Sequence, residues 1–171
     1  MNNNKGFTLI ELLVVISIIG FLATFAVYAF NVARVKARDA KRLADMTLIQ
    51  KALDLYYDNN NRFPSNSDSD CSGWDSGYYV SGDSFISPLE TSQVILEVPG
   101  DPAFSQCGAY RYYRYSAGSY GCSSAKGAFY VLGIIDMESS SRPYPTSPGW
   151  NCPTRNWQNE FDWVVGRFEG S

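Results

Sequence analysis

Hydrophobic residues are concentrated near the N-terminus of the chain. Residues 7–30 contain a single charged side chain, Glu11. As a helix this stretch would be about 36 Å long, which is enough to cross a hydrocarbon core of about 30 Å. Secretory signals have a shorter apolar region, about 7 to 15 residues, followed by a cleavage site. The pattern therefore predicts a transmembrane helix over residues 7–30.

A second helical pattern follows directly. Residues 31–58 contain neither Gly nor Pro, and Asn59–Asn61 and Pro64 then favour a stop. Apolar residues recur at spacings of three or four, which predicts an amphipathic helix continuous with the first. The expected apolar stripe is Ala40, Leu43, Met46, Ile49, Leu53 and Tyr56. The charged residues expected on the other faces are Arg38, Lys41, Arg42, Asp45, Lys51 and Asp54.

The remaining residues, 59–171, predict a globular head. Three runs read as strands, residues 109–116, 128–135 and 161–168, and we expect them to pair antiparallel and pack on the helix. Residues 65–84 and 138–159 are expected to be loops, and residues 88–98 a short helix or strand. In the Tyr-rich run, alternate rings should pack on the helix and on the opposite face of the sheet. The predicted fold class is α+β, a long N-terminal helix packed on a small antiparallel sheet.

Composition and charge narrow the function. The chain of 171 residues has no histidine, which excludes histidine-based catalysis and histidine metal sites. No carboxylate pair or activated serine motif is evident, so we expect no enzyme activity and no cofactor. The net charge of −3 argues against nucleic-acid binding.

A basic cluster at residues 34–42 carries five cations and one acid, Asp39. One interpretation is a solvated face beside lipid headgroups. The alternatives are charge pairing between subunits and capture of DNA. Residues beyond Phe63 carry six cations and twelve acids, so pairing between a basic stem and an acidic head is favoured over DNA.

The four cysteines, Cys71, Cys107, Cys122 and Cys152, indicate disulfides in an oxidising compartment. Three pairings are possible. We favour Cys107 with Cys122, across the turn after the Tyr-rich run, and Cys71 with Cys152, joining two loops. A zinc site is disfavoured because no Cys-x-x-Cys pair exists, and we expect no metal.

Glu11 is an unusual residue for its position. A lone ionised carboxylate among lipid chains costs on the order of 3 kcal/mol, so it requires a partner unless it reaches the interface. A cut between Gly6 and Phe7 would create an amino group at Phe7, four residues from Glu11. One helical turn separates the two positions, so they could form a charge pair within one chain or between neighbours.

The segment from Lys5 to Val15 resembles the class III signal of type IV prepilins and type II secretion pseudopilins. The resemblance implies that a prepilin peptidase removes residues 1–6 by cutting after Gly6 and N-methylates Phe7. It also implies that Glu11 pairs with the N-terminus of an adjacent subunit. Residues 40–64 and Asp101–Pro102 are similar to major pseudopilins. Some pseudopilins bind calcium near the position of Asp136 and Glu138, but the surrounding pattern differs here, so these acids are expected to be solvated.

The resemblance implies a structural subunit of a type IV pilus-like filament. Its partners would be further copies in a helical filament, the prepilin peptidase, the inner-membrane assembly platform and, before assembly, the cytoplasmic membrane with the head outside. The excess of cations after residue 30 would favour the opposite orientation. The alternatives are a pseudopilin of a type II secretion or DNA-uptake system and a membrane-anchored binding module that does not polymerise.

Overall fold

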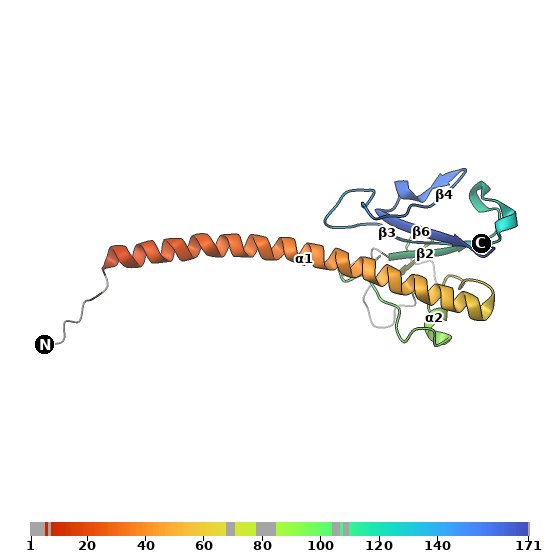
Figure 1. The fold of residues 1–171 in the computed structure, drawn as a ribbon, viewed down its shortest axis with the longest axis horizontal. Helices are drawn as coiled ribbons and strands as arrows, with labels where there is room; N and C mark the ends of the chain where they lie inside the picture. The colour runs from red at the N-terminus through yellow and green to blue at the C-terminus, as the bar shows by residue number, and fades with distance from the viewer. Residues whose placement is uncertain are drawn as a thin grey trace. The chain divides into compact units, whose positions relative to one another are not determined.

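The computed structural model describes residues 6, 8–67, 71–77, 85–103, 107 and 110–170 (Figure 1). The chain divides into two compact units, Met1–Ala37 and Arg38–Ser171. The second unit contains residues 59–171, which we call the head, together with the second half of the long helix.

Helix α1 spans Leu9–Asn60, 52 residues without interruption, as the absence of internal proline predicts. It ends two residues later than expected. Asn61 adopts the left-handed conformation, with φ 55°, and its N–H donates to the carbonyl of Tyr57 at 2.7 Å. Asparagine tolerates this conformation, so Asn61 closes the helix where glycine is more usual.

The main sheet has the strand order β1-β2-β3-β6, and every neighbouring pair is antiparallel. The three predicted strands are confirmed as β2 (Tyr110–Tyr115), β3 (Phe129–Ile134) and β6 (Trp163–Phe168). The expected loop at residues 138–159 contains the two-residue strands β4 (Asn151–Cys152) and β5 (Arg155–Asn156) and one 3₁₀ turn, Trp157–Asn159. Residues 88–98, expected to form a short helix or strand, contain the short helix α2 (Pro88–Thr91).

Strand β1 (Asp75–Gly77) corrects the expectation of a loop over residues 65–84. Its sequence, Asp-Ser-Gly, has no apolar alternation to reveal it. The strand is held by pairing with β2 and by the Asp75 carboxylate, which accepts from the amides of Ser67 at 2.7 Å and Ile86 at 3.3 Å. Long-range contacts therefore determine this strand.

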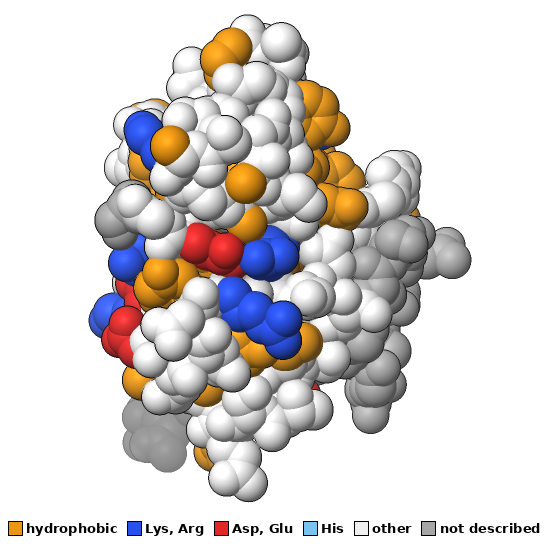
Figure 2. Space-filling model, turned by 90° about the vertical axis from the view of Figure 1, so that its right-hand side faces the viewer, with side chains coloured by type: hydrophobic (Ala, Val, Ile, Leu, Met, Phe, Trp, Pro, Cys, Tyr) orange, Lys and Arg blue, Asp and Glu red, His pale blue; other side chains and the backbone are white. Residues whose placement is uncertain are grey.

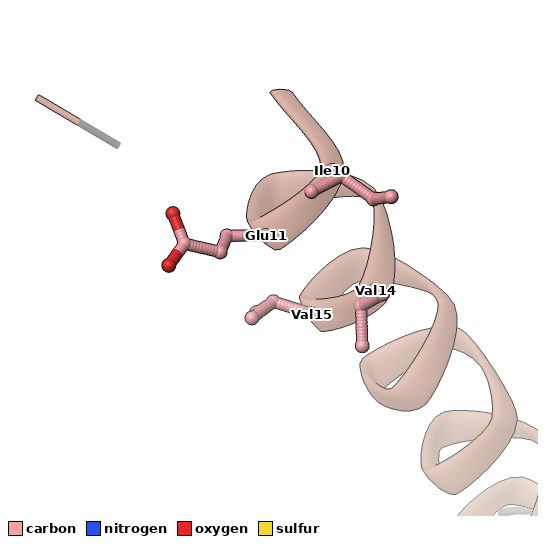
Figure 3. A pocket seen from close by; sticks show the side chains of 4 residues that line it. All are labelled: Ile10, Glu11, Val14 and Val15. Carbon is pink, nitrogen blue, oxygen red and sulfur yellow. The ribbon is translucent and has the colours of Figure 1, made fainter. Parts of the chain in front are cut away.

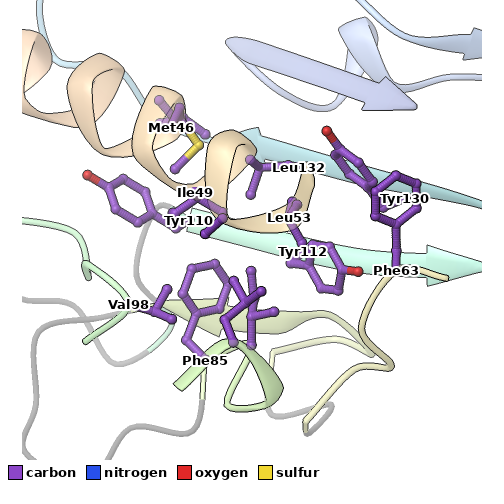
Figure 4. Packing of buried hydrophobic residues seen from close by; sticks show 14 of the residues in the cluster. Met46, Ile49, Leu53, Phe63, Phe85, Val98, Tyr110, Tyr112, Tyr130 and Leu132 are labelled. Atoms are coloured by element: carbon purple, nitrogen blue, oxygen red, sulfur yellow. The ribbon is translucent and has the colours of Figure 1, made fainter. Parts of the chain in front are cut away.

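The main core lies between α1 and one face of the sheet. Met46, Ile49 and Leu53 of α1 point toward Tyr110, Tyr112 and Leu132 of the sheet (Figure 4). The predicted stripe is confirmed at Met46, Ile49, Leu53 and Tyr56, all buried.

The prediction of the apolar stripe is wrong at its N-terminal end, because Ala40 is exposed and Leu43 is only partly buried. The buried face continues instead through Asp39 and Arg42, at the same spacing of three and four residues as Met46 and Ile49. The charged Asp45 is buried as well, so the expectation that Arg42 and Asp45 face solvent is also wrong.

The opposite face of the sheet carries a second apolar cluster. Tyr115 and Phe129 pack there with Trp157 and Phe161, which lie in the segment that covers this face. Tyr110 and Tyr112 instead belong to the core beneath α1, so the two-sided packing predicted for the tyrosines is confirmed. Burial raises the pKa of Tyr115 to about 12, consistent with a packing role.

All four cysteines form disulfides, but the pairing differs from the predicted one. Cys71 binds Cys107, and Cys122 binds Cys152, with Cα–Cα distances of 5.6 and 5.0 Å. Cys107 and Cys122 lie beyond opposite ends of strand β2, whose six residues span about 20 Å. That separation is well beyond the roughly 7 Å that a disulfide tolerates between Cα atoms, which explains why the favoured pairing fails.

Candidate functional site

The first half of α1 presents an apolar surface that nothing in the described chain covers. Every residue from Leu9 to Phe30 is exposed. By length and composition the helix could cross a membrane, although a signal sequence can meet the same criterion. This surface requires lipid or protein around it, because exposing so much contiguous apolar area to water is unfavourable.

Glu11 occupies the first turn of α1. Its carboxylate extends away from the helix beside Ile10, Val14 and Val15 (Figure 3). One carboxylate oxygen, Oε2, accepts from the backbone amide of Thr8 at 2.9 Å and from the Thr8 hydroxyl at 2.6 Å. The amide of Glu11 in turn donates to the Thr8 hydroxyl at 3.3 Å.

These reciprocal bonds form a capping box, in which Thr8 and Glu11 satisfy amides that the helix start leaves free. Thr8 was not among the predicted site residues, although Thr-x-x-Glu before an apolar run is a recognisable signal. Gly6 is exposed. Phe7, the predicted site of cleavage and methylation, lies outside the described residues.

A second polar group lies where α1 enters the head. We call it the Arg42 cluster: Arg38, Asp39, Arg42, Asp101 and Glu138. The Arg42 side chain is 2% exposed, and its guanidinium lies 2.7 Å from Asp39, 3.0 Å from Asp101 and 2.8 Å from Glu138. Arg38 also donates to Glu138, from Nε at 2.7 Å. The cluster therefore joins helix α1 to two distant loops.

The Asp39 carboxylate completes this connection by accepting the amides of Glu138 at 3.1 Å and Ser139 at 2.7 Å. Burial opposes ionisation of Asp39, but these amides and Arg42 outweigh it and lower the pKa of its carboxyl. Hydrogen bonds from Arg38 lower the pKa of Glu138 in the same direction. Burial alone would lower the pKa of Arg42, yet the surrounding carboxylates raise it, so the guanidinium stays charged.

A neighbouring contact extends the polar junction toward the sheet. The Tyr110 hydroxyl donates to Asp45 at 2.8 Å, and burial together with the charge of Asp45 raises the pKa of Tyr110. Lys41 approaches the same carboxylate at 3.6 Å but remains about half exposed.

These contacts correct the interpretation of residues 34–42 as one solvated basic face. Arg42 is buried, and Arg38 is bound to Glu138, which was itself expected to be only solvated. Arg34 and Lys36 remain exposed, and within the described part of the chain neither forms an ion pair. The pairing was not foreseeable because 59 residues separate Arg42 from Asp101 and 100 separate Arg38 from Glu138.

The rest of the head mixes both signs of charge. Figure 2 shows Lys or Arg side chains directly beside Asp or Glu side chains on one face. Arg114 pairs with Glu169 at 2.8 Å, Arg142 with Asp162 at 2.9 Å, and Arg155 with Glu160 at 2.7 Å. Among the described residues, no group of three or more His, Cys, Asp or Glu is arranged to hold a metal ion.

The lowered pKa values of Asp39 and Glu138 predict acid sensitivity. A carboxyl whose pKa is lower in the folded chain contributes stability above its unfolded pKa, near 4, and this contribution disappears as the pH falls. The free energy of unfolding should therefore decrease between about pH 5 and pH 3. Denaturant titrations of the full chain in a non-ionic detergent, repeated at several pH values, would measure this free energy. Asp39→Asn should make it depend less steeply on pH. The same pH dependence of the free energy of unfolding in Asp39→Asn would contradict a contribution of the Asp39 carboxylate to stability.

The fold and the N-terminal site define a class: an α+β protein with a membrane-length N-terminal helix whose first turn carries the only acid of its apolar half. Residues 1–27 match the family model described as the prokaryotic N-terminal methylation motif. No solved structure matches the chain.

The curated relatives match only part of the chain. The chain is 43% identical over 61 residues to type II secretion system core protein G of Pectobacterium carotovorum subsp. carotovorum, covering 36% of this chain and 39% of that protein. It is 42% identical over 61 residues to core protein G of Aeromonas hydrophila, covering 36% and 43%. It is 51% identical over 53 residues to type IV major fimbrial protein FimA of Dichelobacter nodosus, covering 30% and 33%.

The matched region thus spans less than half the length of these relatives. The matches confirm the resemblance to the type IV pilin and pseudopilin family, and the long helix on an antiparallel sheet is a pilin-like arrangement.

Proposed function

We propose that this protein is a structural subunit of a type IV pilus-like filament, assembled through helix α1. The observation that carries the proposal is Glu11, the one charge in the first turn of a helix whose apolar half is fully exposed. Such a helix can reside in a membrane before assembly and then pack against other copies of itself in a filament. Lipid in the first case and neighbouring helices in the second cover the same apolar surface.

The proposed sequence of events begins with removal of residues 1–6 by a prepilin peptidase. The new amino group at Phe7 then becomes N-methylated and supplies the cation that Glu11 lacks. Oε2 of Glu11 already accepts from Thr8, and the other carboxylate oxygen has no protein donor among the described residues. That oxygen is available to the amino terminus of a neighbouring copy.

The proposed organisation is a leader over residues 1–6, a membrane and polymerisation helix over 7–30, an amphipathic helix over 31–58 and a head over 59–171. Before assembly the precursor would lie in the cytoplasmic membrane with its head outside, in contact with an inner-membrane assembly platform. Two disulfides support placement of the head in an oxidising compartment. We propose no catalytic activity, since the relatives are named as fimbrial or secretion-system proteins.

A second candidate is a pseudopilin of a type II secretion or DNA-uptake system. It is favoured by the similarity to several proteins named type II secretion system core protein G. Both candidates use the same helix and the same processing, so the site itself does not distinguish them.

Intact mass and N-terminal sequencing of the native protein test the proposal. We expect a chain that begins at methylated Phe7, and a Gly6→Leu variant should retain residues 1–6. Mature protein in sheared surface material would favour a pilus, whereas mature protein confined to membranes would favour a pseudopilus. A native chain that begins at Met1 in every fraction would contradict both and leave a plain membrane anchor.

A further inference from the structure

The structure divides the basic cluster of residues 34–42 into two groups. Arg38 and Arg42 bind acids of the head, and Lys41 lies 3.6 Å from Asp45. Arg34 and Lys36 are exposed and have no ion pair with any described residue. Because Arg38, Lys41 and Arg42 are already paired with acids of the same chain, Arg34 and Lys36 are the two cations of this cluster that remain available to a partner.

Among the residues of the head that the structure describes, two exposed acids likewise have no ion-pair partner. Glu97 and Asp136 are exposed, and neither forms an ion pair with another described residue. Glu97 lies four residues before Asp101, and Asp136 two residues before Glu138. Since Asp101 and Glu138 both bind Arg42, the two loops that carry the free acids meet at the same level of α1.

The surroundings of Glu97 resemble a contact surface. Glu97 lines a shallow cleft together with Lys41, Pro99 and Gly100. The adjacent Leu96 is fully exposed, so a partner bound at this cleft would also cover an apolar side chain. An apolar residue beside an unpaired acid suits a neighbour that offers both apolar and cationic groups.

We propose that Arg34 and Lys36 of one copy bind Glu97 and Asp136 on the head of a neighbouring copy. The inference rests on the proposed function, because it requires two parallel copies in a filament. Arg34 precedes Arg38 by four residues and Lys41 by seven along α1, which corresponds to about 6 and about 10 Å. A neighbour displaced by about that distance along the helix axis therefore brings the cations to the level of the acids.

Lipid phosphates are the other anions that these cations could meet. Arg34 and Lys36 follow the apolar segment within about 10 Å, so headgroups are within reach in the precursor. A copy that leaves the membrane loses those phosphates. Glu97 and Asp136 of a neighbouring copy are then anions that can replace them, and this charge complementarity favours a second copy as the partner.

Charge reversal with rescue tests the inference in the full chain, in cells that assemble filaments. We expect R34E/K36E and E97K/D136K each to reduce the yield of sheared filaments about tenfold, because attraction becomes repulsion at every interface. The four-residue combination restores opposite charges and should recover most of the yield. Lys51→Glu reverses an exposed cation farther along α1 and serves as the matched control, with little expected change.

Cross-linking gives an independent readout. One copy carrying Lys36→Cys and a second carrying Glu97→Cys should form a disulfide-linked dimer in filaments, visible by non-reducing electrophoresis. Wild-type yields from both reversed variants, or no cross-link in intact filaments, would overturn the inference but leave the proposed function standing. Loss of the R34E/K36E precursor from membranes without rescue would assign the cations to lipid phosphates and also overturn it. Absence of filaments from the wild-type chain would instead count against the proposed function.

Discussion

Replacing Arg42 with alanine should lower the free energy of unfolding of the head by about 3–5 kcal/mol, because it removes the cation from a buried ion pair. Asp39 and Asp101, 1% and 2% exposed, would remain buried without the guanidinium that compensates them. Domains are typically stable by about 5–15 kcal/mol, so this loss would leave a large fraction of the head unfolded under mild denaturation.

Denaturant unfolding of the full chain in detergent, followed by the fluorescence of its four tryptophans, measures the effect. Lys41→Ala is the matched control: it removes the adjacent cation, which is about half exposed and 3.6 Å from Asp45. Exposed pairs contribute roughly 0–1 kcal/mol, so the control should unfold almost as the native chain does. Equal midpoints for Arg42→Ala and Lys41→Ala would show that the Arg42 cluster does not hold the head to α1.

Replacing Glu11 with glutamine should reduce filament yield by about a hundredfold or more. Without the carboxylate, the amino group of Phe7 would be buried among apolar helices without its anion, at a cost on the order of 3 kcal/mol. Each 1.4 kcal/mol is a factor of ten in an equilibrium constant, which gives the expected loss. The amount of precursor in membranes should not fall, because the substitution removes a charge from the apolar segment.

Glutamine is the informative choice because it can still accept from Thr8 and preserve the capping box. The complementary variant Thr8→Ala removes the cap and keeps the charge, and should cost only about 1 kcal/mol of helix stability. Filament yields from both variants separate the two roles of Glu11. Normal assembly of Glu11→Gln with impaired assembly of Thr8→Ala would reduce Glu11 to a capping residue. A non-polymerising membrane anchor would tolerate both changes.

Helix α1 shows how much local pattern can predict. An apolar run followed by residues at spacings of three and four, without internal proline, was enough to place one helix from Leu9 to Asn60 within two residues at each end. Strands β2, β3 and β6 could also be predicted from the sequence, because they are rich in aromatic and β-branched residues. Glu11 was identified because a single acid in an apolar segment conflicts with its surroundings.

The sequence by itself therefore determined the elements whose cause is local: the helix, the main strands, the α+β class and the N-terminal site. Tertiary structure alone decided the pairing of the cysteines, strand β1 and the burial of Asp39, Arg42 and Asp45. In each of these cases the stabilising partner lies far away in sequence, as Asp101 does for Arg42. From sequence, a charged residue on a helix is predicted to face solvent. It can be buried only when folding places a counter-ion beside it, because the attraction of that counter-ion must offset the cost of removing the charge from water.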